Sequence, residues 1–418
     1  MTQASIPPYL RLIFSLTGEA LGLPPSCGVD GEIDWEQFVQ SARSHRVDSL
    51  VDGAITAAKR ADVPEDAARA LRREAMRSWI FSEALAQDLA RVAVAFERES
   101  IPMAALKGPA AAAQAYPDPG RRAMHDLDIL IRPCDVDRAH EVLEASGFEC
   151  VDPAIHLAPH LRDAFLTRTA QFGYTHRQLS YLLELHTAPM HVEELLPISV
   201  DKLIGEAEEC LIAGAPVPAL SPWAQFLLVT IHGAYHAWYR LHWLTDFVAY
   251  LTRYPQWFGG APDEADARWA DIDALGLQDC FGAAFEMARI VFGVEPPAAL
   301  IDRLAVLPAT RPMAEYGVRS LVRNAPPMGV GENLTWARHM VRLRRDWRSR
   351  AASLLWHMSP TYDEIMLLPL TERLAPLYPL LKLALWPLRK SSRPAQESPT
   401  SNAAAEAMAD QSRGRESS

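Results

Sequence analysis

The 418-residue sequence has few cysteines, and the five that it has are scattered along the chain. No two of them form a Cys-x-x-Cys pair, so the sequence favours neither a structural zinc site nor a disulfide framework. The N-terminal residues also lack the basic region of a secretory signal peptide. Because unpaired thiols persist in reducing compartments, we expect a cytoplasmic protein.

Basic residues are also fewer than acidic ones. The chain has 41 Lys and Arg residues against 52 Asp and Glu residues, which gives a formal net charge of −11. Broad nucleic-acid binding depends on Lys and Arg neutralising phosphates, so we do not expect it here. The exception is an arginine-rich run over residues 338–350, predicted to place Arg338, Arg342 and Arg345 on one helix face. A solvated face and a site for an anionic acceptor or lipid headgroup both fit this run.

No long apolar run is free of charge. The most apolar segment, Ile365–Leu388, is interrupted by Glu372, Arg373, Lys382 and several prolines. A membrane-spanning helix needs roughly 20 nearly uninterrupted apolar residues, so we expect this segment to pack on the protein itself, with peripheral membrane contact at most. Residues 391–418 are rich in Ser, Ala and charge and lack aromatic residues, and we expect them to be disordered.

Three common catalytic signatures are absent: the sequence has no G-x-S-x-G, no P-loop and no Rossmann fingerprint on a βαβ unit. Helical periodicity dominates both ends, including a long helix over Pro64–Glu99, and surrounds short apolar strands such as Met103–Leu106. This order of elements predicts an α+β fold. We divide the chain into an N-terminal helical region (1–100), a core (101–215), a C-terminal helical region (216–390) and a disordered tail (391–418).

The most informative segment alternates between acidic and apolar residues over His125–Ile131. In a strand, residues two apart point to the same side, so Asp126 and Asp128 share one face and Leu127, Ile129 and Ile131 share the other. Two neighbouring carboxylates repel each other unless a positive group lies between them. A divalent metal is the commonest reason for such a pair beside a buried apolar face, and the pattern therefore predicts a metal site.

Two further elements extend this candidate site. Lys107 and Gly108 follow the first strand, at a point where a helix could begin with Pro109. Such a turn lets backbone N–H groups approach a phosphate, and Lys107 could pair with that phosphate as a point charge. Downstream, Glu184 lies in a hairpin predicted over residues 171–188. Three carboxylates on adjacent strands could hold two Mg²⁺ ions, as phosphoryl and nucleotidyl transfer require.

Other interpretations of these residues stay open. Lys107 could be an ordinary surface lysine. Glu184 could be the salt-bridge partner of Arg121 or Arg122. Those two arginines could equally contact a phosphate or cap the turn that precedes the aspartates.

Two histidines, His232 and His236, lie four residues apart, which is the spacing of zinc-binding helices. Gly233 stands where an H-E-x-x-H motif needs its catalytic glutamate, and the sequence fixes no third ligand. Metal binding, a place in an acceptor pocket and simple packing are all compatible with this spacing. Together with His186 and Asp246, these histidines are our candidates for the acceptor pocket.

Several blocks of sequence resemble a known family. LKG, YPDPGRR, HDLDILI, AHEVLEASGFE and LELHT, and more loosely RLHWLTDFVAYL and SPTYDEIMLLP, resemble the uncharacterised nucleotidyltransferases of the DNA polymerase β-like superfamily. The resemblance implies a mixed sheet flanked by helices, and transfer of a nucleoside monophosphate from an NTP such as ATP with Mg²⁺ or Mn²⁺. Such proteins tend to be encoded beside genes of polysaccharide or peptide natural-product biosynthesis. The implied acceptor is therefore a small molecule, a sugar or a peptide.

The same resemblance assigns roles to the candidate residues, with Lys107-Gly108 in place of the superfamily's Gly-Ser turn. A second hypothesis keeps the fold without the chemistry: a catalytically inactive NTP-binding or regulatory protein of such a pathway, peripheral to a membrane. The expected site residues are Asp126, Asp128 and Glu184 for catalysis and metal binding, and Lys107, Gly108, Arg121 and Arg122 for the nucleotide.

Overall fold

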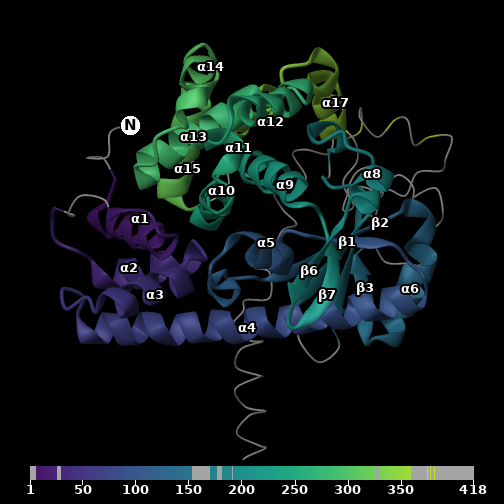
Figure 1. Ribbon diagram of the computed structural model, residues 1–418, viewed down its shortest axis with the longest axis horizontal. Coiled ribbons are helices and arrows are strands. Elements are labelled where there is room, and N and C mark those ends of the chain that lie inside the picture. Colours follow the sequence, from purple (N-terminus) through teal and green to yellow (C-terminus); the bar gives the residue numbers. More distant parts are fainter. Residues whose placement is uncertain are drawn as a thin grey trace, which may run out of the picture.

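The computed structural model describes residues 6–25, 30–152, 170–176, 181–190, 192–325 and 330–358, and the single residues 374, 377 and 381. These residues form the α+β fold that the sequence predicts, with N-terminal helices, a seven-stranded mixed sheet and C-terminal helices (Figure 1). The tail over 391–418 and almost all of the apolar segment over 365–388 lie outside the described residues. Among the helices that are described, none is both long and apolar enough to cross a membrane.

The sheet has the strand order β3-β4-β5-β2-β1-β7-β6. Strand β2 lies between β1, to which it is antiparallel, and β5, to which it is parallel. Strands β4 and β5 pair antiparallel, which confirms the hairpin predicted over residues 171–188. The strands are β1 (Met103–Leu106), β2 (Asp126–Ile131), β3 (Phe148–Asp152), β4 (Gln171–His176), β5 (Leu182–His186), β6 (Glu208–Ile212) and β7 (Ala215–Ala219).

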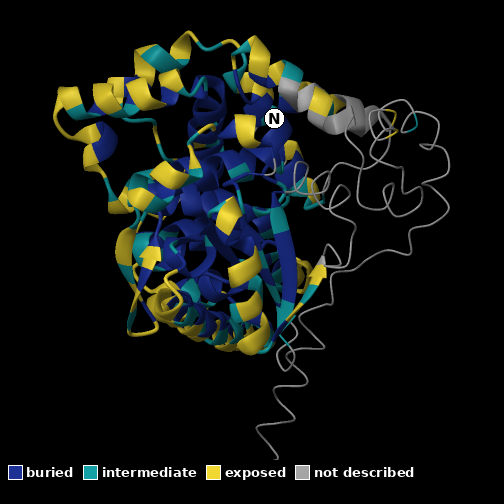
Figure 2. Ribbon diagram, turned by 90° about the vertical axis from the view of Figure 1, so that its right-hand side faces the viewer, coloured by how far each residue is buried: buried dark blue, intermediate teal, exposed yellow. Residues whose placement is uncertain are grey.

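The two faces of β2 differ as its alternating sequence predicts. Leu127, Ile129 and Ile131 are fully buried in a core that they share with side chains of β5. Helices α4 (Glu65–Arg98) and α6 (Val136–Ala145) contribute the other side of this core. Buried residues fill the centre of the molecule, and exposed residues lie on the outer turns of the helices (Figure 2). The opposite face of β2 carries the two aspartates and Leu130, which is buried in a second core.

One long helix connects the N-terminal helices to the sheet. Helix α4 has 34 residues and is therefore about 51 Å long. It passes beneath both the N-terminal helices and the sheet (Figure 1) and confirms the long helix predicted over Pro64–Glu99. Near its start it contacts α2 (Trp35–Ser44) and α3 (Asp48–Ala58), and α1 (Pro8–Ala20) packs on these two helices.

The helical periodicity over Trp223–Tyr250 belongs to two helices, α9 (Pro222–Tyr235) and α10 (Leu241–Arg253). The chain turns between them because Ala237 and Trp238 adopt positive φ angles of 50° and 54°. The Trp238 ring folds back over Gly233, where an added Cβ would lie 2.3 Å from it. Helix α9 begins as predicted, with the Ser221 hydroxyl accepting a hydrogen bond from the N–H of Ala224.

The arginine-rich run over residues 338–350 is not one helix face, and that prediction is wrong. Helix α16 (Val330–Arg342) ends within the run, and α17 (Trp347–Met358) begins after a break. In the break, Arg345 forms an ion pair with Asp279 at 2.7 Å, and Arg344 donates to the carbonyl oxygen of Glu194. These contacts attach part of the run to the protein's own helices.

The hairpin of β6 and β7, which lies beside β1, was not predicted from the sequence. Strand β7 carries Pro216 and Pro218, and proline is disfavoured in strands because it cannot donate a hydrogen bond. Both prolines are exposed, and β7 pairs with β1 only through Ala219. The sheet therefore runs on past residue 215. The remaining α-helices are α5 (Gly108–Ala115), α8 (Val200–Gly205), α11 (Gln256–Gly259), α12 (Pro262–Ala274), α13 (Gln278–Phe292), α14 (Ile301–Ala305) and α15 (Thr310–Arg323).

Candidate functional site

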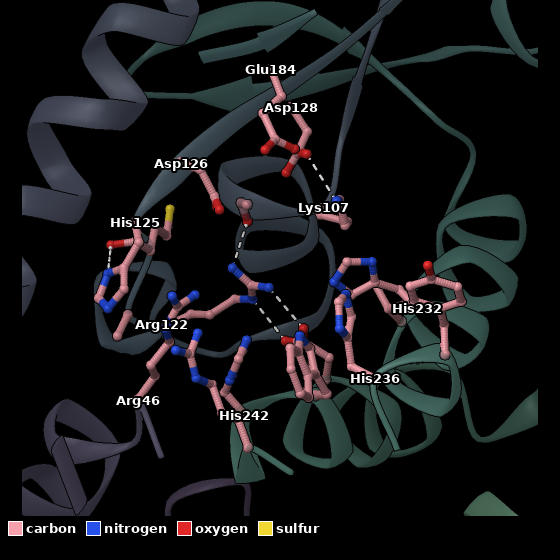
Figure 3. A pocket seen from close by; sticks show the side chains of 18 of the residues that line it. Arg46, Lys107, Arg122, His125, Asp126, Asp128, Glu184, His232, His236 and His242 are labelled. Carbon is pink, nitrogen blue, oxygen red and sulfur yellow. Dashed lines mark hydrogen bonds and ion pairs between the residues drawn. The ribbon is translucent and has the colours of Figure 1, made fainter. Parts of the chain in front are cut away.

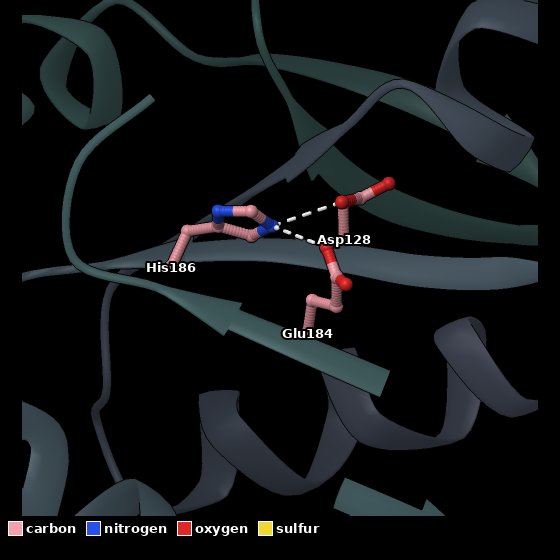
Figure 4. A group of neighbouring side chains, drawn as sticks. All are labelled: Asp128, Glu184 and His186. Atoms are coloured by element: carbon pink, nitrogen blue, oxygen red, sulfur yellow. Dashed lines mark hydrogen bonds and ion pairs between the residues drawn. The ribbon is translucent and has the colours of Figure 1, made fainter. Parts of the chain in front are cut away.

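The register of β2 and β5 brings three potential metal ligands together. Asp128 lies directly opposite Glu184, and His186 follows two residues later on the same face of β5. The Nε2 atom of His186 lies 2.9 Å from Oδ1 of Asp128 and 3.5 Å from Oε2 of Glu184 (Figure 4). Ligand atoms of the three residues all lie within 4.8 Å of one another. This arrangement could hold a metal ion.

Lys107 belongs to this cluster and is not a surface residue. It sits at the turn from β1 into α5, and its Nζ lies 2.8 Å from Oδ1 of Asp128, with 14% of its side chain exposed. Lys107 and Gly108 both have positive φ, 41° and 36°. A side chain at Gly108 would be strained in this conformation. The turn thus holds a lysine against the carboxylates and begins a helix beside them.

Burial and charge set the protonation states of the cluster. Burial alone would raise the pKa of Asp128, but Lys107 and the hydrogen bond with His186 outweigh it and hold this pKa below its usual value. Burial and the repulsion of Asp128 raise the pKa of Asp126. Burial lowers the pKa of His186, yet its hydrogen bonds to Asp128 and Glu184 raise it by more. Asp128 is therefore the carboxylate that stays ionised most readily.

These residues line a cavity of about 250 Å³, close to the lower end of the range for small-ligand pockets. The carboxylates of Asp126, Asp128 and Glu184 lie at one end of it (Figure 3). Arg46 and His242 lie at the other end, with Arg122 between the two ends. We call these the carboxylate end and the arginine end, the latter comprising Arg46, Arg240 and His242.

Arg122 and Asp246 form a buried ion pair. The guanidinium of Arg122 donates two hydrogen bonds to the Asp246 carboxylate, at 2.7 and 2.8 Å, and both side chains are buried. Tyr116 donates a third, at 2.6 Å, and Arg122 also reaches the carbonyl oxygen of Gly108 at 3.3 Å. The pair therefore fixes α10 to the turn at Lys107 and Gly108. Asp246 borders the cavity, and both of its carboxylate oxygens accept these hydrogen bonds.

Arg121 lies outside the cavity lining, contrary to the place expected for it beside a nucleotide. It donates to the carbonyl oxygen of Ser49 and forms an ion pair with Asp118, both at 3.1 Å. In the part of the chain that is described, Glu184 has no ion pair with Arg121 or Arg122, so that alternative is wrong.

His232 and His236 border the cavity from α9 and the turn that follows it (Figure 3). The ring of His236 stacks on Trp243, with centroids 4.9 Å apart, and lies 4.6 Å from the ring of His232. Within the described residues, neither histidine belongs to a group that could hold a metal ion. Both rings therefore lie at the cavity wall, packed against each other and, for His236, against Trp243.

The sequence did not predict the arginine end of the cavity. Arg46 lies between α2 and α3, and Arg240 lies just before α10, so no motif connects them. Arg240 does stand in the RLHWLTDFVAYL block, which was the one available signal. No sequence signal marks Arg46, because only the fold brings it beside Arg240 and the cavity.

A mixed sheet with facing acidic residues, a strand-to-helix turn beside them and helices over the cavity defines a nucleotidyltransferase-type fold. The chain matches the family described as uncharacterised nucleotidyltransferases over residues 31–293, and it belongs to that family. This confirms the resemblance seen in the sequence, and the match includes every residue that lines the cavity. No curated protein matches the chain.

Proposed function

We propose that the protein is a metal-dependent nucleotidyltransferase that moves a nucleoside monophosphate from an NTP to a small-molecule, sugar or peptide acceptor. The observation that carries this proposal is the facing pair Asp128 and Glu184, which the sheet places with His186 on the wall of a cavity. Membership of the nucleotidyltransferase family supports the nucleotide as substrate. The volume of the cavity favours a small acceptor group over a folded macromolecule.

The donor set fits Mg²⁺ or Mn²⁺. Asp128 and Glu184 offer carboxylate oxygens, which hard divalent ions prefer. The imidazole nitrogen of His186 suits Mn²⁺ better than Mg²⁺. Asp126 points into the same cavity and could complete the set. A bound ion would neutralise charge on the triphosphate and polarise the attacking oxygen.

The chain's own residues carry the other roles in this proposal. Lys107 and the turn at Gly108 lie against the carboxylates, so we assign them to the triphosphate. Within the described residues, Asp126 has no ion-pair partner, and we assign it as the base for the acceptor hydroxyl. The acceptor oxygen attacks the α-phosphorus, its proton passes to Asp126, and pyrophosphate leaves. His232 and His236 face the acceptor side of the cavity.

Pyrophosphate release is the direct test. The full chain should release pyrophosphate from one NTP in the presence of Mg²⁺ or Mn²⁺ and a metabolite extract, with transfer of label to an acceptor. Asp128→Asn should lower this rate by about 10³-fold or more, because it removes several kcal/mol of charge stabilisation. Asp271→Asn, at an exposed position of α12, is the matched control. Full activity of both Asp126→Asn and Asp128→Asn would reject the assignment.

A second candidate is an inactive NTP-binding or regulatory protein. The observation that favours it is the ammonium group of Lys107, which lies 2.8 Å from the carboxylate that a metal would use. Calorimetry with Mg²⁺ and each NTP separates the two functions. Saturable binding without pyrophosphate release for any extract supports this candidate, and turnover rejects it.

We further propose a cytoplasmic protein whose membrane contact is peripheral at most. The scattered cysteines and the absence of a spanning helix among the described residues support this placement. Sedimentation with anionic vesicles at low salt tests the peripheral contact. Binding that disappears at high salt would support it, and absence of binding at low salt would exclude it.

A further inference from the structure

The arginine end of the cavity holds two positive charges without a carboxylate partner. Arg46 and Arg240 both line the cavity, and the described residues give neither of them an ion pair. Arg122, between the two ends, differs because Asp246 neutralises it. Burial and the nearby charge of Arg240 lower the pKa of Arg46 to about 10, although the more distant charge of Asp126 acts in the opposite direction. The two guanidinium groups therefore repel each other where they stand.

The fold holds these arginines together through His45. The N–H of Leu241, at the start of α10, donates to Nδ1 of His45 at 3.1 Å. The N–H of His242 donates to the carbonyl oxygen of His45 at 3.2 Å. His45 thus caps α10 and places its own neighbour, Arg46, beside Arg240. Burial lowers the pKa of His45 to about 3, which keeps its ring neutral and able to accept.

The backbone conformation of Arg46 is a second indication of a ligand site. Its φ is 61°, a left-handed conformation just after the end of α2. Glycine or asparagine normally fills this position, because other residues are strained there. His242, on the same wall, has a buried Nδ1 without a hydrogen-bond partner. A strained, unpaired arginine beside an unsatisfied ring nitrogen indicates that a ligand completes this end of the cavity.

We propose that Arg46, Arg240 and His242 form a subsite for a phosphate group of a substrate, at the opposite end of the cavity from the metal-binding carboxylates. Two arginines match the two charges of a terminal phosphate, whereas a carboxylate would neutralise only one of them. The planar guanidinium groups can each donate two hydrogen bonds to phosphate oxygens. The identity of the substrate rests on the proposed function, but phosphate binding at this subsite needs neither metal nor turnover, so it is tested separately.

The test is binding of inorganic phosphate and pyrophosphate to the full chain by calorimetry, in EDTA and at low salt. Binding should be saturable, and Arg46→Gln and Arg240→Gln should each weaken it about 10- to 100-fold, the usual cost of a charge-assisted contact. Arg46→Lys should restore part of the affinity. Arg69→Gln, at an exposed position of α4, should stay within about twofold of the unaltered protein.

Thermal unfolding shows whether the variants are folded. Because they relieve repulsion, Arg46→Gln and Arg240→Gln should unfold at the same temperature as the unaltered protein or above it. Absence of saturable phosphate binding, or phosphate affinity in both glutamine variants equal to that of the unaltered protein, overturns the proposal. If one variant unfolds early, the other variant and Arg46→Lys still decide the outcome.

Two sources of phosphate are distinguished by competition. If NTP displaces inorganic phosphate and loses tenfold affinity in the glutamine variants, the subsite binds the triphosphate. If NTP and phosphate bind together and NTP affinity is unchanged, the subsite binds a phosphate of the acceptor. Both results uphold the subsite. Absence of transferase activity would leave this result intact, so the two proposals fail separately.

Discussion

The two ends of the cavity are built in different ways. At the carboxylate end, the ligand atoms come from neighbouring strands, and Asp128 is balanced by Lys107 and His186. At the arginine end, Arg46 and Arg240 come from helix termini and have no carboxylate partner among the described residues. At the first end positive and negative groups are in direct contact, whereas at the second the attraction of Asp126 for Arg46 acts only over a longer distance. The carboxylate end therefore neutralises part of its own charge, and the proposed subsite would gain its countercharge from a phosphate.

The largest effect should come from the paired arginine between the two ends. Asp246→Asn leaves the Arg122 guanidinium buried without a countercharge, and we expect a loss of about 3 kcal/mol in the free energy of unfolding. Urea denaturation measures this loss. Asp271→Asn should change the value by less than about 0.5 kcal/mol. If Asp246→Asn is equally mild, the contrast between paired and unpaired arginines disappears.

The next effect concerns the carboxylate end. His186→Ala should weaken Mn²⁺ binding about 10- to 100-fold, and Mg²⁺ binding by less, because imidazole is the better ligand for Mn²⁺. Electron paramagnetic resonance of free Mn²⁺ gives the affinity directly. His232→Ala, on the opposite wall, should stay within about twofold. Equal Mn²⁺ affinity in His186→Ala would show that the carboxylates alone hold the ion.

A smaller effect should appear as a pH dependence of stability. The pKa of His45 is about 3 in the folded protein and about 6.5 in the unfolded chain. Between these two pH values the unfolded state binds a proton at His45 and the native state does not, so the free energy of unfolding falls as the pH is lowered. Its contribution is complete above pH 6.5 and is lost as the pH falls towards 3. His45→Asn should reduce the slope of unfolding free energy between pH 6 and 4 by about 1.4 kcal/mol per pH unit. An unchanged slope in urea denaturation would mean that His45 is not the neutral cap.

The smallest effect is expected for Arg121. Because it lies outside the cavity, Arg121→Gln should alter NTP affinity by less than about twofold. The same change removes its hydrogen bond to the carbonyl of Ser49 and should cost about 1 kcal/mol of stability. Calorimetry and urea denaturation measure the two values. A tenfold loss of NTP affinity would return Arg121 to the nucleotide site and extend the cavity towards α3.

The parts of the site that could be predicted are those with a local signal. Asp126 and Asp128 were singled out because a strand repeats every two residues, and Glu184 because it lies in the predicted hairpin and matches the family's third carboxylate. The same period places His186 on the face of Glu184, although we had assigned it to the acceptor pocket. Arg122 was expected at a phosphate, and its partner Asp246 could not be inferred, because 124 residues separate them. The turn between α9 and α10 escaped prediction because it depends on the packing of Trp238 over Gly233.

By itself, the sequence determined which side chains share a strand face, where the strand-to-helix turn falls and where the long helix α4 begins and ends. These features follow from backbone geometry over a few residues. Only the tertiary structure decided that β2 pairs with β5, that Arg122 meets Asp246, and that Arg46 stands beside Arg240. The last of these depends on a hydrogen bond between residues 196 positions apart, and contacts over such separations are set by the packing of the whole chain.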